Sequence, residues 1–314
     1  MLPAYVGKIS YLCRTKSHLQ MKILITGAGG QLGSELAGVL PGRLPGAELV
    51  FTDAANLDIT DATAVDGFVS NGGFTHIVNC AAYTAVDRAE EDKALCTAVN
   101  VDAVGYLAAA AENCGARMLH ISTDYVFDGR SCTPYTESDL PAPRSHYGVT
   151  KRRSETLLLG LLPEAIIIRT GWLYSSYGKN FVKTMLRLAA ANTSVNVVCD
   201  QIGTPTYARD LAEAIAAIIA APQWIPGIYH FADEGVASWY DFAQAVFDIS
   251  GTACKAVPIP TADYPTAAER PSFSVLDKSK IKATYGIEIP HWRHSLAHCI
   301  ECLGAQADSA NQHS

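Results

Sequence analysis

The chain has 314 residues, of which 49% are apolar, and a formal net charge of -7. That much apolar material can form the core of one large α/β unit or of two lobes, and the scattered lysines and arginines form no basic face for nucleic acid. No continuous apolar run approaches the roughly 20 residues that cross a bilayer. We therefore expect neither a nucleic acid nor a membrane as a partner.

Residues 1–20 precede the first strand expected from the sequence and contain basic but no acidic residues. They lack the apolar block of a secretory signal, so we expect a disordered extension, with a transit peptide as the alternative. The nine cysteines are not placed at the spacings of a disulfide framework. This pattern indicates reduced thiols and a cytoplasmic location.

A glycine-rich turn is expected near the start of the chain. The apolar run Lys22–Thr26 predicts a buried strand, and the apolar residues after Gln31 have helical spacing, so Gly27, Gly30 and Gly33 lie between a strand and a helix. Such a turn lets backbone N–H groups and the positive end of the helix approach a pyrophosphate. The sequence therefore predicts a dinucleotide site here; the alternative is an ordinary glycine turn.

Two aspartates follow the expected second strand, Glu48–Thr52. Asp53 lies at its end, about 20 residues after the glycines, where a carboxylate can accept hydrogen bonds from the adenosine ribose. This mildly favours NADH over NADPH, unless Asp53 is simply a turn residue. Asp58 is available either to the adenine amino group or to the N-terminus of the next helix.

Three further strands are expected over residues 75–79, 118–122 and 165–169, with a long alanine-rich helix over 89–113. Strands that alternate with helices at this spacing imply right-handed parallel crossovers. We therefore predict the α/β class, with a doubly wound parallel sheet of the Rossmann type.

The alternation fades beyond residue 170, although residues 228–231 still have a strand-like pattern. We therefore expect a dinucleotide-binding domain over 21–170 and a smaller substrate lobe over 171–303, interleaved with the end of the sheet. Residues 304–314 are expected to form a frayed tail.

A tyrosine and a lysine are spaced for acid–base chemistry. Tyr147 and Lys151 lie four residues apart at an expected helix start, so their side chains project from one face. A nearby ammonium favours the phenolate, which is expected to lower the tyrosine pKa and makes Tyr147 a candidate general acid/base. Ser122 and Thr123 supply hydroxyls at the carboxyl end of a strand, where open α/β sheets bind ligands.

Taken together, these motifs resemble the extended short-chain dehydrogenase/reductase family. Within it, five segments between residues 122 and 271 resemble the dTDP-4-dehydrorhamnose reductases, and the resemblance runs from about residue 21 to 300. These segments are Ser122–Gly129, Arg169–Tyr174, Asn180–Leu186, Asp200–Thr206 and Tyr264–Pro271.

The resemblance implies reduction of the C4 ketone of dTDP-4-dehydro-L-rhamnose by NADPH or NADH. Tyr147 would protonate the C4 oxygen, Thr123 would hydrogen-bond it, and Lys151 would hold the nicotinamide ribose. Further residues would line the cofactor: Gly30, Gln31, Leu32, Asp58, Ile59, Ala82, Tyr83 and Thr84. Residues bordering the dTDP-sugar would be Thr123, Asp124, Trp172, Asn180 and Arg270.

Several of these residues have structural alternatives. Trp172 could be part of the core, Asn180 could cap a helix, and Arg270 could be a solvated loop charge. Some related reductases are dimers linked by magnesium, but Arg209 stands at the position that we align with one of their metal carboxylates. We therefore expect no metal, and a monomer or weak homodimer.

Two other functions remain open. A sugar-nucleotide dehydratase or epimerase could share the fold, but related dehydratases carry an Asp-Glu pair where this chain has Asp124 followed by Tyr125. A non-catalytic, cofactor-bound regulatory subunit is the second alternative. The complete set of Thr123, Tyr147 and Lys151 favours an enzyme.

Overall fold

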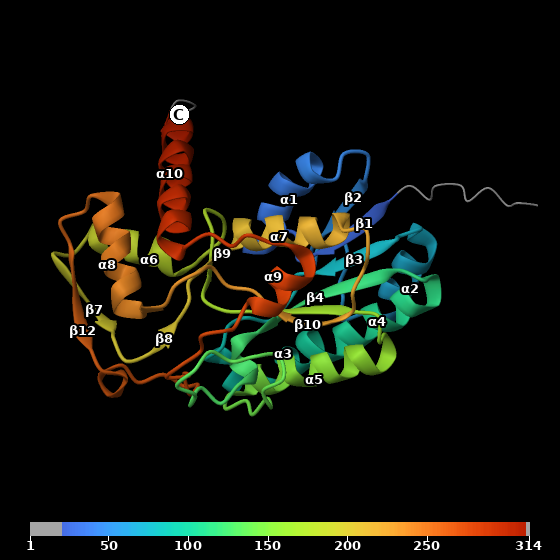
Figure 1. Cartoon of the computed structure of the whole chain (residues 1–314), viewed down its shortest axis with the longest axis horizontal. Coiled ribbons are helices and arrows are strands. Elements are labelled where there is room, and N and C mark those ends of the chain that lie inside the picture. The colour runs from blue at the N-terminus through green and yellow to red at the C-terminus, as the bar shows by residue number, and fades with distance from the viewer. Residues whose placement is uncertain (1–20, 312–314) are drawn as a thin grey trace, which may run out of the picture.

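The computed structural model describes residues 21–311, so the extension expected over residues 1–20 lies outside the described residues. Figure 1 shows a larger lobe, in which helices flank a central sheet, beside a smaller lobe that contains β7, β12 and α8.

The central sheet has six parallel strands in the order β10-β5-β4-β3-β1-β2. From β1 the chain continues to β2 at one edge of the sheet, and from β3 it continues in the opposite direction, to β4. The strand order therefore reverses between β1 and β3, and doubly wound sheets bind ligands at such a switch point. The predicted fold class is therefore confirmed. The strands are β1 (Lys22–Thr26), β2 (Glu48–Thr52), β3 (His76–Asn79), β4 (Arg117–Thr123), β5 (Ile166–Thr170) and β10 (Gly227–His230).

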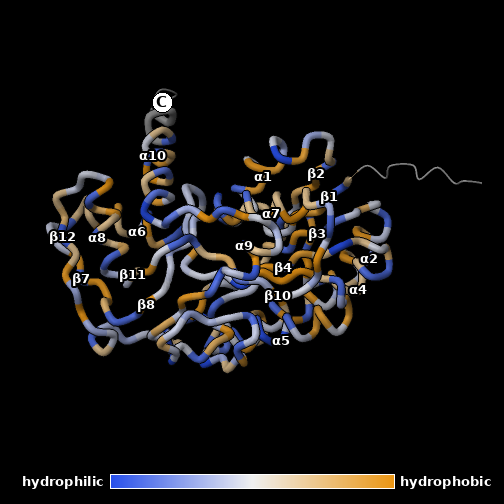
Figure 2. The backbone as a smooth tube through the Cα atoms, in the orientation of Figure 1, coloured by the Kyte–Doolittle hydropathy of each residue, from blue (hydrophilic) through white to orange (hydrophobic). Residues whose placement is uncertain are grey.

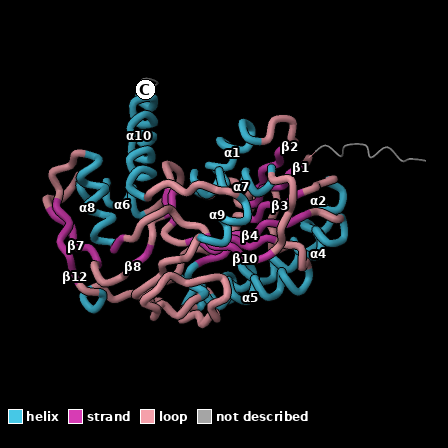
Figure 3. Tube along the Cα trace, in the orientation of Figure 1, coloured by secondary structure: helices cyan, strands magenta, loops and turns pink. Residues whose placement is uncertain are grey.

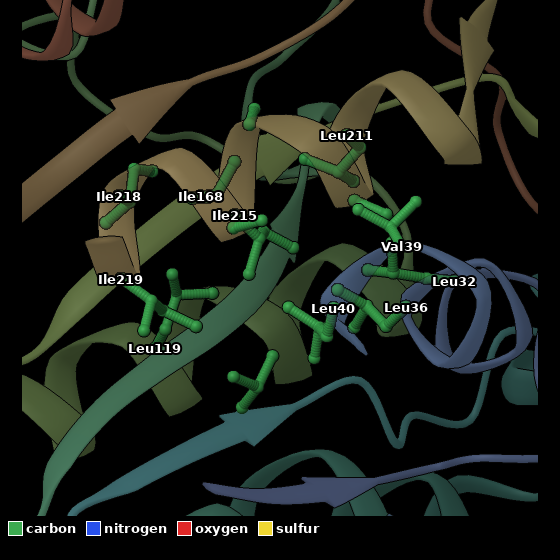
Figure 4. Close-up of a cluster of buried hydrophobic side chains, with 14 of the residues drawn as sticks. Leu32, Leu36, Val39, Leu40, Leu119, Ile168, Leu211, Ile215, Ile218 and Ile219 are labelled. Carbon is green, nitrogen blue, oxygen red and sulfur yellow. The ribbon is translucent and has the colours of Figure 1, made fainter. Parts of the chain in front are cut away.

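Helices cover both faces of this sheet (Figure 1). On one face α1 packs beside α7, and Leu36, Leu40 and Ile215 belong to the core that they share (Figure 4). The other face carries α2, α4 and α5. Because both faces are covered, the strands are apolar along most of their length, as Figure 2 shows. The helices are α1 (Gln31–Arg43), α2 (Ala62–Gly72), α4 (Ala103–Cys114), α5 (His146–Leu161) and α7 (Ala208–Ala220).

The long helix expected over residues 89–113 is interrupted. A 3₁₀ turn, η1 (Arg88–Glu90), precedes α3 (Lys93–Thr97), and the π-helical turn η2 (Ala98–Asp102) joins α3 to α4. The stretch Lys93–Cys114 is long and apolar enough to span a membrane, but half of its most apolar window is buried inside the fold. We interpret it as a core helix.

The smaller lobe is built from short paired strands and helices (Figure 3). Its pairs are β6 (Leu173–Tyr174) with β9 (Thr206–Tyr207), β7 (Ser194–Val198) with β12 (Lys255–Ile259), and β8 (Ile202–Gly203) with β11 (Ala237–Ser238). Its helices are α6 (Phe181–Ala189), α8 (Trp239–Ser250) and α10 (Trp292–Asn311), whereas α9 (Ser279–Tyr285) packs against β10 of the central sheet. Two single 3₁₀ turns, η3 (Asp124–Val126) and η4 (Thr261–Asp263), lie elsewhere in the chain.

α10 continues to Asn311, so the described part of the tail expected from residue 304 is helical. Alanine and glutamine, which favour helices, are frequent in this segment, and no proline interrupts it.

Candidate active site

A cavity of about 1300 Å³ opens at the carboxyl ends of the sheet strands, and residues of both lobes line it. Most of the site residues predicted from the sequence meet there. They are Gly27, Gly30, Gln31, Leu32, Gly33, Ala82, Thr84, Thr123, Asp124, Tyr147, Lys151, Trp172, Asn180 and Arg270.

Four predicted cofactor residues are not among the cavity-lining residues. Asp53 closes its own turn by accepting a hydrogen bond from Ala55 N at 2.9 Å. Asp58 likewise accepts from Thr60 N and Oγ1, while Asp61 and not Asp58 caps α2. Ile59 is buried in the core, and the Tyr83 hydroxyl donates to Asp92.

The glycine turn has a tightly packed backbone. Gly27 has a φ of +71°, and a Cβ there would lie 2.7 Å from Ala81 N. A Cβ on Gly33 would lie only 2.4 Å from the Gly27 carbonyl oxygen, whereas Gly29 has open space around it. The turn therefore requires glycine at Gly27 and Gly33, and it holds the N-terminus of α1 against the end of β1, as a pyrophosphate site needs.

Tyr147 lies near the start of α5, which Ser145 caps through its side chain. Tyr147 is 8% exposed, and its ring meets Tyr125 edge to face. The expectation that a neighbouring lysine lowers its pKa is wrong in this structure. Burial raises the pKa of Tyr147, and hydrogen bonding to Thr123 offsets only part of that shift.

Lys151 lies one turn further along α5, and its ammonium group is directed toward the sheet. Nζ donates to the Ile121 carbonyl at 2.7 Å and lies 3.0 Å from His120 Nε2. Burial lowers the pKa of Lys151 to about 8, although the Glu155 carboxylate raises it in part. Lys151 can therefore change its protonation state close to neutral pH.

Thr123 and Asp124 stand where β4 ends. The Thr123 hydroxyl donates to Asp124 Oδ1 at 3.0 Å and accepts from Tyr125 N. Asp124 is buried, its Oδ2 has no hydrogen-bond partner among the described residues, and burial raises its pKa to about 6. Asp124 lines the cavity, although almost none of its surface is exposed.

Trp172 is the only described non-glycine residue with a positive φ, +51°. Its ring stacks on Trp239 with centroids 3.5 Å apart, and a Cβ on Gly203 would lie 2.5 Å from it. The sequence reasoning missed Trp239, which also lines the cavity and donates to Gln201 at 3.2 Å. No local motif could have identified it, because its partner ring lies 67 residues away.

Asn180 and Arg270 both line the cavity, and both have hydrogen-bond partners within the protein. Asn180 caps α6 and also donates to Gln31 Oε1 at 3.0 Å, which ties the smaller lobe to the first residue of α1. Arg270 lines the cavity, where it pairs with Asp87 and donates to the Tyr125 hydroxyl.

A glycine turn, a buried tyrosine and lysine on one helix, and a second lobe closing the cavity define an extended short-chain dehydrogenase/reductase. The model of the RmlD substrate binding domain family matches residues 21–304. The chain belongs to this family, that of the dTDP-4-dehydrorhamnose reductases.

Individual relatives agree with this assignment. The chain is 45% identical to a dTDP-4-dehydrorhamnose reductase of Aggregatibacter actinomycetemcomitans, over 88% of this chain and 97% of that protein. The crystal structure of such a reductase from Clostridium acetobutylicum is 42% identical, has a TM-score of 0.87, and matches 90% of this chain and all of that one. One from Bacillus anthracis, in complex with NADP, is 35% identical, has a TM-score of 0.86, and matches 89% and 98%.

Proposed function

We propose that this protein reduces the C4 ketone of dTDP-4-dehydro-L-rhamnose to dTDP-L-rhamnose, with NADPH or NADH as reductant. The observation that carries the proposal is that Thr123, Tyr147 and Lys151 line the same cavity as the glycine turn. A hydroxyl donor, a proton source and a cation are thus placed beside the expected cofactor site.

The residues present fit a dinucleotide, because the turn packs so closely that side chains are excluded at Gly27 and Gly33. The bound cofactor supplies the hydride. Tyr147, whose raised pKa keeps it protonated at neutral pH, gives its proton to the C4 oxygen. Thr123 hydrogen-bonds the same oxygen, and the Lys151 ammonium stabilises the phenolate that forms.

The sugar nucleotide would lie against the smaller lobe. Trp172 and Trp239 offer a flat apolar surface to the sugar, and Asp124 lines the same cavity. Arg270 can exchange Asp87 for a phosphate, since a guanidinium binds either anion.

The test is product identification by NMR after incubation with dTDP-4-dehydro-L-rhamnose, in separate reactions with NADPH and NADH. We expect dTDP-L-rhamnose as the product. Tyr147→Phe should lower kcat at least 100-fold, because general acid catalysis accelerates a reaction by roughly that factor. Tyr106→Phe, on the exposed side of α4, is the matched control and should retain activity.

The same assay separates the alternatives. A dehydratase or epimerase would change the sugar without net consumption of reduced cofactor. The position after Asp124 holds Tyr125, which meets Tyr147 edge to face and brings no second carboxylate. A regulatory subunit would bind cofactor tightly without turnover.

We further propose that the protein is cytoplasmic, binds no divalent metal, and is a monomer or weak homodimer. The Arg209 guanidinium stabilises the charged forms of both Glu35 and Asp210, so these carboxylates already have a cationic partner. A calorimetric titration that detects tight magnesium binding, or a magnesium-dependent dimer in analytical ultracentrifugation, would contradict this proposal.

A further inference from the structure

A buried histidine lies beneath Lys151, and the proposed mechanism does not use it. His120 is on β4, has no exposed surface, and lies between Asn79 at the end of β3 and Lys151 on α5. Burial lowers its pKa well below the usual value, so the imidazole is neutral. A neutral imidazole carries one proton, and the neighbouring groups determine which nitrogen holds it.

Asn79 determines this tautomer. The Asn79 carbonyl Oδ1 accepts hydrogen bonds from the Thr26 hydroxyl at 2.7 Å and from the Ala81 backbone N–H at 3.2 Å. A backbone N–H can only donate, so turning the amide over would oppose Asn79 Nδ2 to the Ala81 N–H. Asn79 Nδ2 therefore donates to His120 Nδ1 at 3.1 Å, and the imidazole proton must be on Nε2.

The Nε2–H of His120 points at an amine. Lys151 Nζ is 3.0 Å away, and the Ser154 hydroxyl, which already donates to the Lys151 carbonyl, is more distant at 3.4 Å. An ammonium would oppose its own N–H to the Nε2–H, whereas a neutral amine would accept the hydrogen bond with its lone pair. This geometry disfavours the charged form of Lys151.

We propose that His120 is a positioning residue, held by Asn79 in its Nε2-protonated tautomer, which turns a donor toward Lys151 Nζ and so disfavours the ammonium form of this lysine. The other titratable groups that face Lys151 are Glu155 on α5, Cys96 on α3 and Cys80 after β3. This inference rests on the proposed reductase function only for its kinetic consequence.

The first experiment does not require turnover. Histidine ¹⁵N NMR of the full chain distinguishes the two neutral tautomers and the imidazolium, and His120→Gln identifies the signal. We expect His120 to be neutral with its proton on Nε2 between pH 6 and 8. A proton on Nδ1, or an imidazolium, would overturn the inference even if the reductase function holds.

The second experiment follows kcat against pH with dTDP-4-dehydro-L-rhamnose and NADPH. Asn79→Asp keeps an acceptor for Thr26 and Ala81 but requires a proton on His120 Nδ1, so Nε2 becomes an acceptor for the ammonium. His120→Gln can offer its carbonyl in the same place. Both should move the basic limb upward by about one pH unit, a roughly tenfold gain at high pH relative to pH 7.

Two comparisons make this result decisive. His76→Gln replaces another buried histidine at the far end of β3 and should leave the basic limb where it is. A purely structural role for His120 would lower the Tm of its variants without moving the limb. An unmoved limb in Asn79→Asp, in which NMR shows the switched tautomer, would refute the proposal, and this variant is nearly isosteric should His120→Gln fail to fold.

Discussion

Replacing Gly33 with alanine tests the glycine turn directly. The added Cβ would lie 2.4 Å from the Gly27 carbonyl oxygen and 2.7 Å from Ala28 Cα, both backbone atoms that cannot rotate away. An ordinary contact needs about 3.4 Å, so the N-terminus of α1 must withdraw by about 1 Å. Overpacking of this kind costs about 1–3 kcal/mol of unfolding free energy.

The same withdrawal weakens cofactor binding. Hydrogen bonds from backbone N–H groups to a charged phosphate contribute about 1.5–3 kcal/mol each, and a 1 Å displacement breaks one of them. We therefore expect the NADPH Kd of Gly33→Ala to rise by about 10- to 150-fold, measured by quenching of tryptophan fluorescence. Gly38→Ala, on the exposed side of the same helix with open space around it, is the control and should bind as the wild type does. An unchanged Kd and Tm in Gly33→Ala would refute this reasoning.

Three further predictions concern the core, the pH dependence and the aromatic pair. Glu155→Gln leaves the Arg169 guanidinium buried beside a neutral amide. We therefore expect the free energy of unfolding to fall by about 3–5 kcal/mol, measured by thermal unfolding, and an unchanged Tm would contradict this. Burial lowers the pKa of His76 to about 4, so the stability that depends on its neutral form is complete above pH 6.5 and is lost as the pH falls to 4. His76→Gln should reduce that loss by about 3 kcal/mol in urea unfolding at pH 7 and pH 4, and equal losses would refute it. Trp239→Ala removes the ring that stacks on Trp172 and should raise the KM for the dTDP-sugar about tenfold with an unchanged NADPH Kd, whereas a changed Kd would place Trp239 at the cofactor.

Local sequence patterns predicted the elements on which the site is built. The strand before Gly27, the helix that begins at Gln31, and the spacing of Tyr147 and Lys151 are all set by residues close together in the chain. The fold class follows from such patterns, and most of the site residues that were predicted from the sequence line the cavity.

What the sequence could not predict depends on contacts between distant residues. Asp53 and Asp58 satisfy their carboxylates within their own turns, an outcome that spacing alone does not distinguish from ligand binding. The direction of the Lys151 ammonium depends on His120, 31 residues away, and the pKa of Tyr147 depends on its burial.

The return of the chain to the central sheet after residue 200 limits how this protein can be divided. β10 covers the edge of β5, and α7 covers the apolar side of α1. A fragment that ends near residue 170 would leave the edge of β5 unpaired and the apolar side of α1 exposed. Both features promote aggregation. We therefore expect the nucleotide-binding half to be expressed as a folded, non-aggregating protein only if the fragment continues through His230.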